Sequence, residues 1–256
     1  MEILRNLGAG GRLICTDRDE EALRRLRERF TDGRVTVARA RFSDLSSVLG
    51  TVGVTLVDGI LFDLGVSSFQ LRDGDRGFSF ESDARLDMRM DSESTLTAWH
   101  IVNRYPAREI ADILWKYADE RRSRRIARAV AEERQRGEIS TCRQLADLVT
   151  RVCGGKRGKI HPATRTFQAL RIAVNREPEE LSCGLDQSVR LLGDRGRLCV
   201  ISYHSLEDRI VKHFIREMSA KKVLAPVVKK PITASREEVR RNPSSRSAKL
   251  RGAEKL

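Results

Sequence analysis

The chain has 256 residues, of which 40% are hydrophobic and 33% charged, and its formal net charge is +13, from 49 Lys and Arg against 36 Asp and Glu. This balance is typical of a globular protein and excludes a disordered or fibrous one. No apolar run approaches the roughly 18 residues that span a bilayer, and no signal sequence opens the chain. We therefore expect a cytoplasmic protein without a membrane partner.

The cysteines and histidines point to no metal. The five cysteines are scattered and form no CxxC pair, and the four histidines show no metal-ligand spacing. We expect free thiols in a reducing compartment and no structural metal.

Positive charge is concentrated towards the C-terminus. Residues 219–256 hold eleven Lys or Arg and three Glu, which accounts for +8 of the +13. An excess of this size favours a polyanionic partner, most often nucleic acid, although it also serves general solubility. The segment reads as an RNA-contacting arm, as a segment packed back on the rest of the chain, or as one that is mobile when unbound.

Short apolar strands alternate with helices at the two ends of the chain. Residues 11–17 and 34–38 read as strands followed by helical patterns, and residues 54–62 form a third apolar stretch that ends at Asp63. Residues 196–202 form another such strand much later. This alternation predicts an α/β fold with a mostly parallel sheet covered on both faces.

Between these two parts, residues 95–180 show helical spacing alone. We therefore expect a discontinuous α/β domain of residues 1–94 and 181–256, with an inserted all-helical domain of residues 95–180. Five arginines crowd one stretch of the insertion, as a solvated helix face or, in the sharper reading, as a nucleic-acid surface. These are Arg121, Arg122, Arg124, Arg125 and Arg128.

Acidic residues follow the strands at the ends where ligands of open α/β sheets bind. Asp17 is placed to hold the hydroxyls of a nucleoside ribose, with Asp19 as the nearby alternative, although an Asp after a strand also caps the next helix. Asp63 precedes Gly65, which permits a tight turn, and the hydroxyl of Ser67. A carboxylate there can accept a hydrogen bond from the exocyclic amine of cytosine and help to remove its proton. A capped strand-to-helix turn is the alternative.

Six long sequence blocks stand in a fixed order along the chain. They are residues 63–70 (DLGVSSFQ), 76–80 (RGFSF), 86–90 (LDMRM), 158–175 (GKIHPATRTFQALRIAVN), 200–209 (VISYHSLEDR) and 242–251 (NPSSRSAKLR). In their residues and their order, these blocks closely resemble the motifs of the bacterial 16S ribosomal RNA (cytosine-N4)-methyltransferase family, RsmH, formerly MraW. The resemblance is far more specific than a single glycine motif.

The resemblance implies an S-adenosylmethionine-dependent enzyme that methylates N4 of a cytidine in the decoding centre of 16S rRNA, with free 16S rRNA or the small ribosomal subunit as its partner. It also implies a Rossmann-like class I methyltransferase sheet with an inserted all-helical domain for substrate recognition. By motif, the cofactor contacts fall on Asp17 at the ribose, Phe42 beside the adenine, Asp63 and Gln70.

Catalytic roles are expected at Asp63 and Ser67, which position the amine, and at His204, which lines the base pocket or relays the proton. For His204 a helix-capping or core role is the alternative. Basic and loop residues are expected to contact RNA. These are Lys159, His161, Arg165, Arg246 and Lys249.

The chain departs from the family at its start. The family opens with a strand and a glycine-rich loop, whereas this chain opens inside the following helix, and Gly8, Gly10 and Gly11 form only a helix-to-strand turn. In a sheet of order 3-2-1-4-5-6, a missing first strand leaves its two neighbours with unpaired backbone groups. We therefore expect the true start to lie upstream, with an inactive paralogue as the other reading.

Two other functions are compatible with the sequence. One is an RNA-binding or assembly protein that has lost catalysis. The other is a DNA cytosine-N4 methyltransferase, but those enzymes usually carry a Pro-Pro-Tyr-type motif where this chain has Leu-Gly-Val at residues 64–66.

Overall fold

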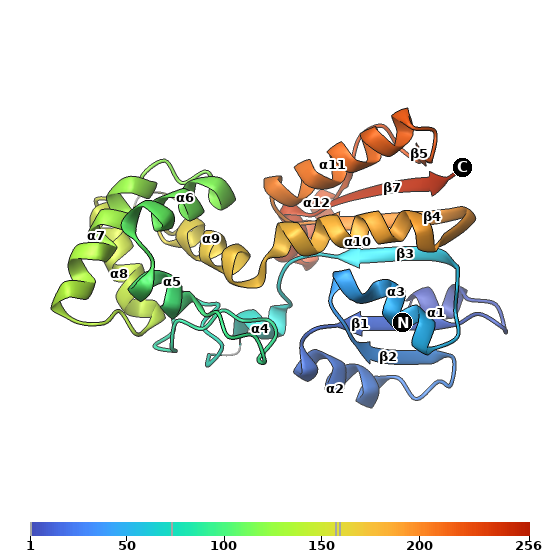
Figure 1. The fold of residues 1–256 in the computed structure, drawn as a ribbon, viewed down its shortest axis with the longest axis horizontal. Coiled ribbons are helices and arrows are strands. Elements are labelled where there is room, and N and C mark those ends of the chain that lie inside the picture. Colours follow the sequence, from blue (N-terminus) through green and yellow to red (C-terminus); the bar gives the residue numbers. More distant parts are fainter. Residues whose placement is uncertain (1, 73, 157, 159) are drawn as a thin grey trace. The chain divides into compact units, whose positions relative to one another are not determined.

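A computed structural model gives the architecture and describes residues 2–72, 74–156, 158 and 160–256 (Figure 1). The chain folds into two compact units, one of Met1–Gly65 with Pro178–Leu256 and one of Val66–Glu177. We call them the sheet unit and the helical unit. In the part of the chain that is described, no helix combines the length and apolarity needed to cross a membrane.

The sheet unit is built from parallel pairs of strands. β1 (Leu13–Asp17) pairs in parallel with β2 (Val35–Arg39), and β3 (Val57–Asp63) pairs in parallel with β4 (Leu192–Ser202). β3 and β4 lie on either side of the helical unit in the sequence, so the sheet unit is discontinuous. The Rossmann-like α/β fold predicted from the sequence is confirmed.

The C-terminal residues extend the sheet that contains β3 and β4. β7 (Lys249–Lys255) runs antiparallel between β4 and β5 (Leu224–Pro226), and β6 (Ile232–Thr233) pairs with the start of β7. The last strand of the chain therefore lies inside the sheet.

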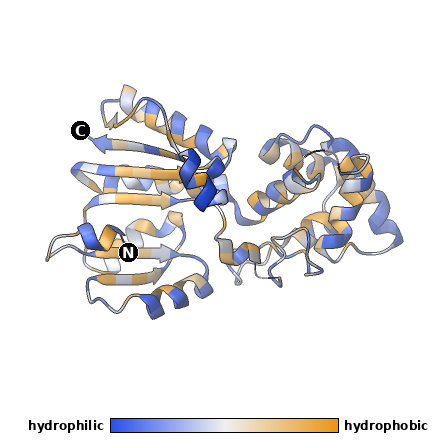
Figure 2. Cartoon of the chain, turned by 180° about the vertical axis from the view of Figure 1, so that it is seen from behind, coloured by the Kyte–Doolittle hydropathy of each residue, from blue (hydrophilic) through white to orange (hydrophobic). Residues whose placement is uncertain are grey.

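The helices of the sheet unit bury apolar side chains against the strands. Leu181 and Leu185 of one helix and Val211 of another share a core with Phe62 and Val200. Figure 2 shows that α2 and α12 carry mainly hydrophilic residues. The helices are α1 (Glu2–Asn6), α2 (Glu20–Arg29), α3 (Leu45–Thr51), α10 (Glu177–Leu191), α11 (Ser205–Ala220) and α12 (Arg236–Arg241), with short 3-10 helices at Phe42–Asp44 and Pro243–Ser247.

The strands form two separate sheets. Among the described residues, β1 pairs with β2 alone and β3 pairs with β4 alone, although β1 and β3 point in the same direction in Figure 1. In the middle of β3, the apolar Leu61 is 47% exposed. The facing edges of β1 and β3 therefore have no strand partner among the described residues.

The helical unit packs its helices around a second core. Leu114, Ile126, Leu145 and Leu170, from four different helices, are all buried there. The helices are α4 (Ser68–Arg72), α5 (Ala98–Arg104), α6 (Ala107–Ala118), α7 (Ser123–Arg136), α8 (Cys142–Val152) and α9 (Thr164–Asn175).

The boundary between the units differs from the one expected at 94/95. Residues 66–94 belong to the helical unit, because Leu86, Met88 and Met90 are buried in its core. The second boundary falls at 177/178, three residues before the expected 180/181.

Asn175 at the end of α9 holds this early segment in place. Its Nδ2 donates to the Met88 carbonyl at 2.7 Å, and its Oδ1 accepts from the Met90 amide at 2.8 Å. Met88 has φ 62°, a left-handed conformation that is strained for a residue with a side chain. The two hydrogen bonds stabilise that conformation, so two of the sequence blocks meet in the fold.

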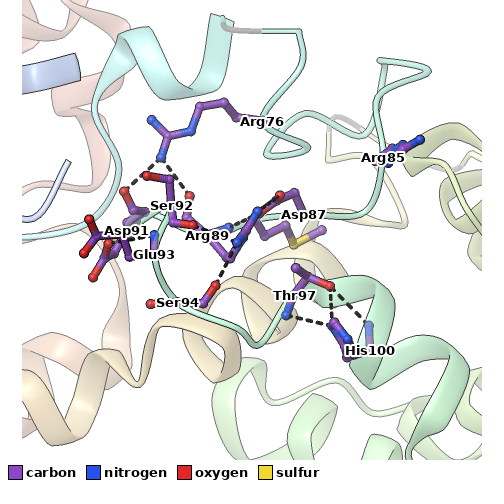
Figure 3. Close-up of polar contacts among 12 residues, drawn as sticks. Arg76, Arg85, Asp87, Arg89, Asp91, Ser92, Glu93, Ser94, Thr97 and His100 are labelled. Atoms are coloured by element: carbon purple, nitrogen blue, oxygen red, sulfur yellow. Dashed lines mark hydrogen bonds and ion pairs between the residues drawn. The ribbon is translucent and has the colours of Figure 1, made fainter. Parts of the chain in front are cut away.

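Arginines fix the rest of the same segment (Figure 3). Arg76 donates to the carbonyls of Arg89 and Met90, and Arg89 forms a two-pronged pair with Asp87 at 2.8 and 2.7 Å. Burial raises the pKa of Asp87, but the hydrogen bonds from Arg89 outweigh it and hold the pKa below its usual range. The block at 86–90 therefore has a structural role in the helical unit.

The basic C-terminal segment is anchored to the sheet unit by an ion-pair cluster. Lys249 and Arg251 of β7 donate to the two carboxylate oxygens of Asp208 on α11, at 2.9 and 2.7 Å. Burial raises the pKa of Asp208, but the two cations outweigh that effect and hold the pKa below its ordinary value. Residues 249–255 of the C-terminal segment therefore pack back on the chain, which is one of the three alternatives stated for that segment.

The variant Asp208→Asn leaves Lys249 and Arg251 without a carboxylate, and we expect the free energy of unfolding to fall by about 2 kcal/mol near neutral pH. Because the folded-state pKa is depressed, this stabilisation is present above the unfolded value of about 3.9 and is lost as the pH falls through the folded value. Urea unfolding at a series of pH values measures the difference, which should shrink towards acid. The exposed Asp194→Asn is the control, and an equal loss there would contradict the assignment.

Candidate active site

Two acidic residues, Asp17 and Asp19, lie between β1 and α2 and form different contacts. Asp19 caps α2 by accepting from the Glu21 amide at 3.1 Å and is buried. Asp17 is the last residue of β1, and its Oδ1 accepts from the Asp19 amide at 2.9 Å. Burial raises the pKa of Asp17, although the Asp19 amide opposes this. Asp19 is therefore the residue that caps α2. The Asp17 carboxylate has further lone pairs that can accept hydrogen bonds from another group.

Phe42 follows β2 and packs towards the end of β3. Its ring meets that of Phe62 edge to face, with centroids 4.9 Å apart. Gly184 of α10 lies so close that a Cβ there would approach the Phe42 Cβ to 2.7 Å. One side of the Phe42 ring thus belongs to the core, while the residue is only partly buried.

Asp63 ends β3 and is held by a side chain of the neighbouring strand. The hydroxyl of Tyr203, which follows β4, donates to Asp63 Oδ1 at 3.0 Å. Loss of surrounding water raises the pKa of Asp63, the Tyr203 hydrogen bond opposes this, and the negative charge of Glu207 adds to it. Loss of water and the Asp63 charge raise the pKa of Tyr203 to about 12, so its hydroxyl stays a donor.

Gly65 makes the turn after this strand. It has φ +86°, which favours glycine, and a Cβ there would meet the Tyr203 ring at 3.6 Å. The amide of Leu64 still donates to the Ile201 carbonyl, so the turn begins only after the pairing of β3 with β4 ends.

Contacts connect the three strand ends into one edge of the sheet unit. The Ala40 amide donates to the Asp17 carbonyl at 3.0 Å, and Phe42, two residues later, contacts Phe62 next to Asp63. The expectation that Asp17 and Asp63 lie at the same edge agrees with these contacts and with the common direction of β1 and β3 in Figure 1.

His204 is the N-cap of α11, which was the alternative to a catalytic role. Its Nδ1 accepts from the Glu207 amide at 3.4 Å, and its Nε2 lies 3.2 Å from Glu207 Oε1. Glu207 in turn accepts from the amides of Tyr203 and His204. Both ring nitrogens of His204 are therefore engaged by Glu207, and its proposed catalytic role stays a prediction.

Two predicted site residues lie in the helical unit and contact each other. The Ser67 amide donates to Gln70 Oε1 at 2.8 Å, and the Gln70 amide donates to Ser67 Oγ at 3.2 Å. These bonds form the start of α4 and bury Gln70. The roles of Ser67 in positioning and of Gln70 in cofactor binding stay predictions.

The predicted RNA contacts divide between the units. In the helical unit, His161 stacks on Phe80 with centroids 4.4 Å apart, and Arg165 donates to the Asp119 carbonyl at 3.0 Å. In the sheet unit, Arg246 is exposed, whereas Lys249 is partly buried and pairs with Asp208. Lys159 lies outside the described residues.

Tyr203 and Glu207 are site residues to which the sequence reasoning gave no role. Tyr203 directly follows a predicted strand, as Asp63 does, and this shared position was the available signal. The parallel register, which places Asp63 opposite Ile201, is what brings the tyrosine hydroxyl to the carboxylate.

An edge of parallel strands that carries Asp17 and Asp63 beside a partly buried aromatic ring is the architecture of a Rossmann-like methyltransferase. Comparison with protein families makes the assignment specific, since the model of the MraW methylase family matches residues 1–256. The chain belongs to that family, and the resemblance seen in the sequence is confirmed.

Individual relatives agree with this assignment. A protein of Caldicellulosiruptor saccharolyticus named Ribosomal RNA small subunit methyltransferase H is 44% identical over 271 residues, covering 100% of this chain and 88% of that protein. Proteins with the same name from Thermomicrobium roseum and Deinococcus deserti are 46% and 50% identical, covering 99% and 98% of this chain and 83% and 82% of their own lengths.

The variant Tyr203→Phe removes the hydroxyl that stabilises the charged form of Asp63. We expect the pKa of Asp63 to rise further above its ordinary value, because the opposing hydrogen bond is lost. Carbon-13 NMR titration of the Asp63 carboxyl measures the change. Tyr117→Phe in the helical unit serves as the control, and an unchanged Asp63 pKa in Tyr203→Phe would show that the hydrogen bond is not formed in solution.

Proposed function

We propose that the protein transfers a methyl group from S-adenosylmethionine to N4 of a cytidine in the decoding centre of 16S rRNA. The observation that carries the proposal is the Asp63 carboxylate, held by Tyr203 at the end of β3 with a raised pKa. The names of the relatives support small-subunit rRNA as the substrate, and a cytoplasmic location follows from that substrate.

The residues at the strand ends fit the proposed cofactor. Bound S-adenosylmethionine supplies a methyl group on a positively charged sulfur, so that attack by an amine breaks the carbon–sulfur bond and forms a carbon–nitrogen bond. Asp17 retains acceptor capacity for ribose hydroxyls, because the Asp19 amide occupies only part of its carboxylate. Phe42, partly buried near the same edge, offers a ring face for the adenine. Gln70 is proposed as a further contact.

Asp63 is proposed to accept a hydrogen bond from the N4 amine and then to take its proton. A raised pKa suits this task, because the basicity of a carboxylate rises with its pKa. Tyr203 orients the carboxylate, and Ser67 is proposed to help position the amine. The cytidine has to leave its stack to reach this edge, as in other enzymes that modify bases.

RNA binding without methyl transfer is the second candidate function. The observation that favours it is the break between β1 and β3, which carry Asp17 and Asp63 at their ends. Binding of S-adenosylmethionine distinguishes the candidates, because the second one does not need it.

The variant Asp63→Asn keeps the shape of the side chain but cannot accept the proton. We expect methyl transfer from labelled S-adenosylmethionine to small-subunit rRNA to fall by about 10²–10⁴-fold. Asp58→Asn, at the other acidic residue of β3, is the matched control. Wild-type activity in Asp63→Asn would remove Asp63 from the mechanism.

The variant Asp17→Ala removes the proposed ribose acceptor, and we expect S-adenosylmethionine to bind about 10- to 100-fold more weakly, as for the loss of a charge-assisted hydrogen bond. Isothermal titration calorimetry measures the affinity. Asp19→Asn, which keeps a good helix cap, should bind nearly as well as the wild type. If the wild-type chain binds more weakly than about 1 mM, the second candidate function is favoured instead.

A further inference from the structure

The helical unit carries a cluster of exposed arginines at the start of α7. Five of the eight residues 121–128 are arginines, and all five are exposed. Within the described residues, none of them forms an ion pair with a carboxylate. We call this set the arginine corner: Arg121, Arg122, Arg124, Arg125 and Arg128.

Other arginines of the protein contrast with this cluster. Later in α7, Arg134 donates to the carbonyls of Val102 and Tyr105 at 3.0 and 2.7 Å. On α2 of the sheet unit, Arg24 and Arg27 pair with glutamates of the same helix. The fold therefore pairs arginines elsewhere, whereas among the described residues those of the arginine corner have no carboxylate partner.

The arginine corner also opposes the local stability of α7. The helix has no acidic residue in its first turn, and its N-cap, Arg122, makes no side-chain capping bond. Positive charges at a helix N-terminus interact unfavourably with the helix dipole, and Arg124 repels Arg128 one turn later. Charges that are kept at such a cost are best explained by a polyanionic partner.

Hydrogen bonds tie the backbone around the arginine corner to neighbouring elements of the helical unit. Arg125 donates to the Val152 carbonyl at the end of α8, at 3.4 Å, and Arg165 of α9 donates to the Asp119 carbonyl after α6, at 3.0 Å. The buried Glu120 carboxylate accepts from the Arg122 amide at 2.9 Å. The backbone that carries these cations is therefore held in place by the fold, and less order has to be gained on binding than from a loose segment.

An aromatic side chain lies on the helix turn that leads into the same corner. Trp115 of α6 is 56% exposed, and its carbonyl accepts from the Asp119 amide at 3.0 Å. An exposed indole ring provides a stacking surface for an unpaired base.

We infer that the arginine corner, with Arg165 and Trp115, is the surface on which the helical unit binds single-stranded RNA. The guanidinium groups bind backbone phosphates, and the indole stacks on an unpaired base. The choice of RNA rests on the proposed function, which the inference extends by naming the binding surface.

The charge part of the inference is tested by two matched double variants of the full chain. Arg124→Gln with Arg128→Gln removes two cations of the arginine corner, and Arg24→Gln with Arg27→Gln removes two paired cations of α2. Fluorescence anisotropy with a labelled single-stranded rRNA fragment of about 20 nucleotides gives Kd over a salt series. We expect the first variant to lose about 1.4 from the slope of log Kd against log salt, and the second to keep the wild-type slope. Equal changes in both would overturn the inference.

The stacking part is tested by Trp115→Ala, an exposed position where folding should be retained, as circular dichroism verifies. We expect RNA to bind about 5- to 100-fold more weakly with little change in the salt slope. Wild-type affinity in this variant would remove Trp115 from the surface.

Two further measurements separate this inference from its alternatives. Acidic phospholipid vesicles that bind the wild type as tightly as RNA, and lose binding in the same arginine variant, would assign the surface to a membrane and overturn the inference. Methyl transfer with an unchanged KM for rRNA in the arginine variant would overturn it while leaving the proposed function intact. RNA binding through the arginine corner without methyl transfer would contradict the proposed function and leave this inference intact.

Discussion

The parallel pairing of β3 with β4 is the constraint on which the candidate active site depends. It joins strands that lie more than a hundred residues apart in the chain and places Asp63 opposite Ile201, so that Tyr203 reaches the carboxylate. In an antiparallel pair these two strand ends would lie at opposite edges of the sheet. The hydrogen bond then keeps the Asp63 carboxylate in a fixed orientation, and partial loss of water around it raises its pKa.

The sequence predicted the α/β fold and the acidic strand ends because these features are local. An apolar run followed by Asp17 or Asp63 reports a strand and its end without reference to the rest of the chain. Motifs then supplied the family, which the comparisons confirm over the whole chain. What each residue contributes was harder to predict, since for His204 the sequence left a catalytic and a capping role open and the structure shows the capping contact.

Features that depend on distant partners were predicted incorrectly or not at all. The boundary expected at 94/95 fell instead at 65/66, because Asn175 binds the backbone of Met88 across 87 positions of sequence. The ion pair of Lys249 with Asp208, at 2.9 Å, was not foreseen, and the RNA contact of Lys249 stays a prediction. Neither hydrophobic periodicity nor charge counting reports which side chains meet in a fold.

The position of β7 has a consequence for the biosynthesis of the protein. In the strand order β3-β4-β7-β5, the strand nearest the C-terminus lies between two that are translated before it. During translation, β4 and β5 therefore have to wait for residues 249–255 to leave the ribosome before their edges are covered. Exposed strand edges recruit other chains. The nascent sheet unit is accordingly prone to aggregation until residues 249–255 have emerged.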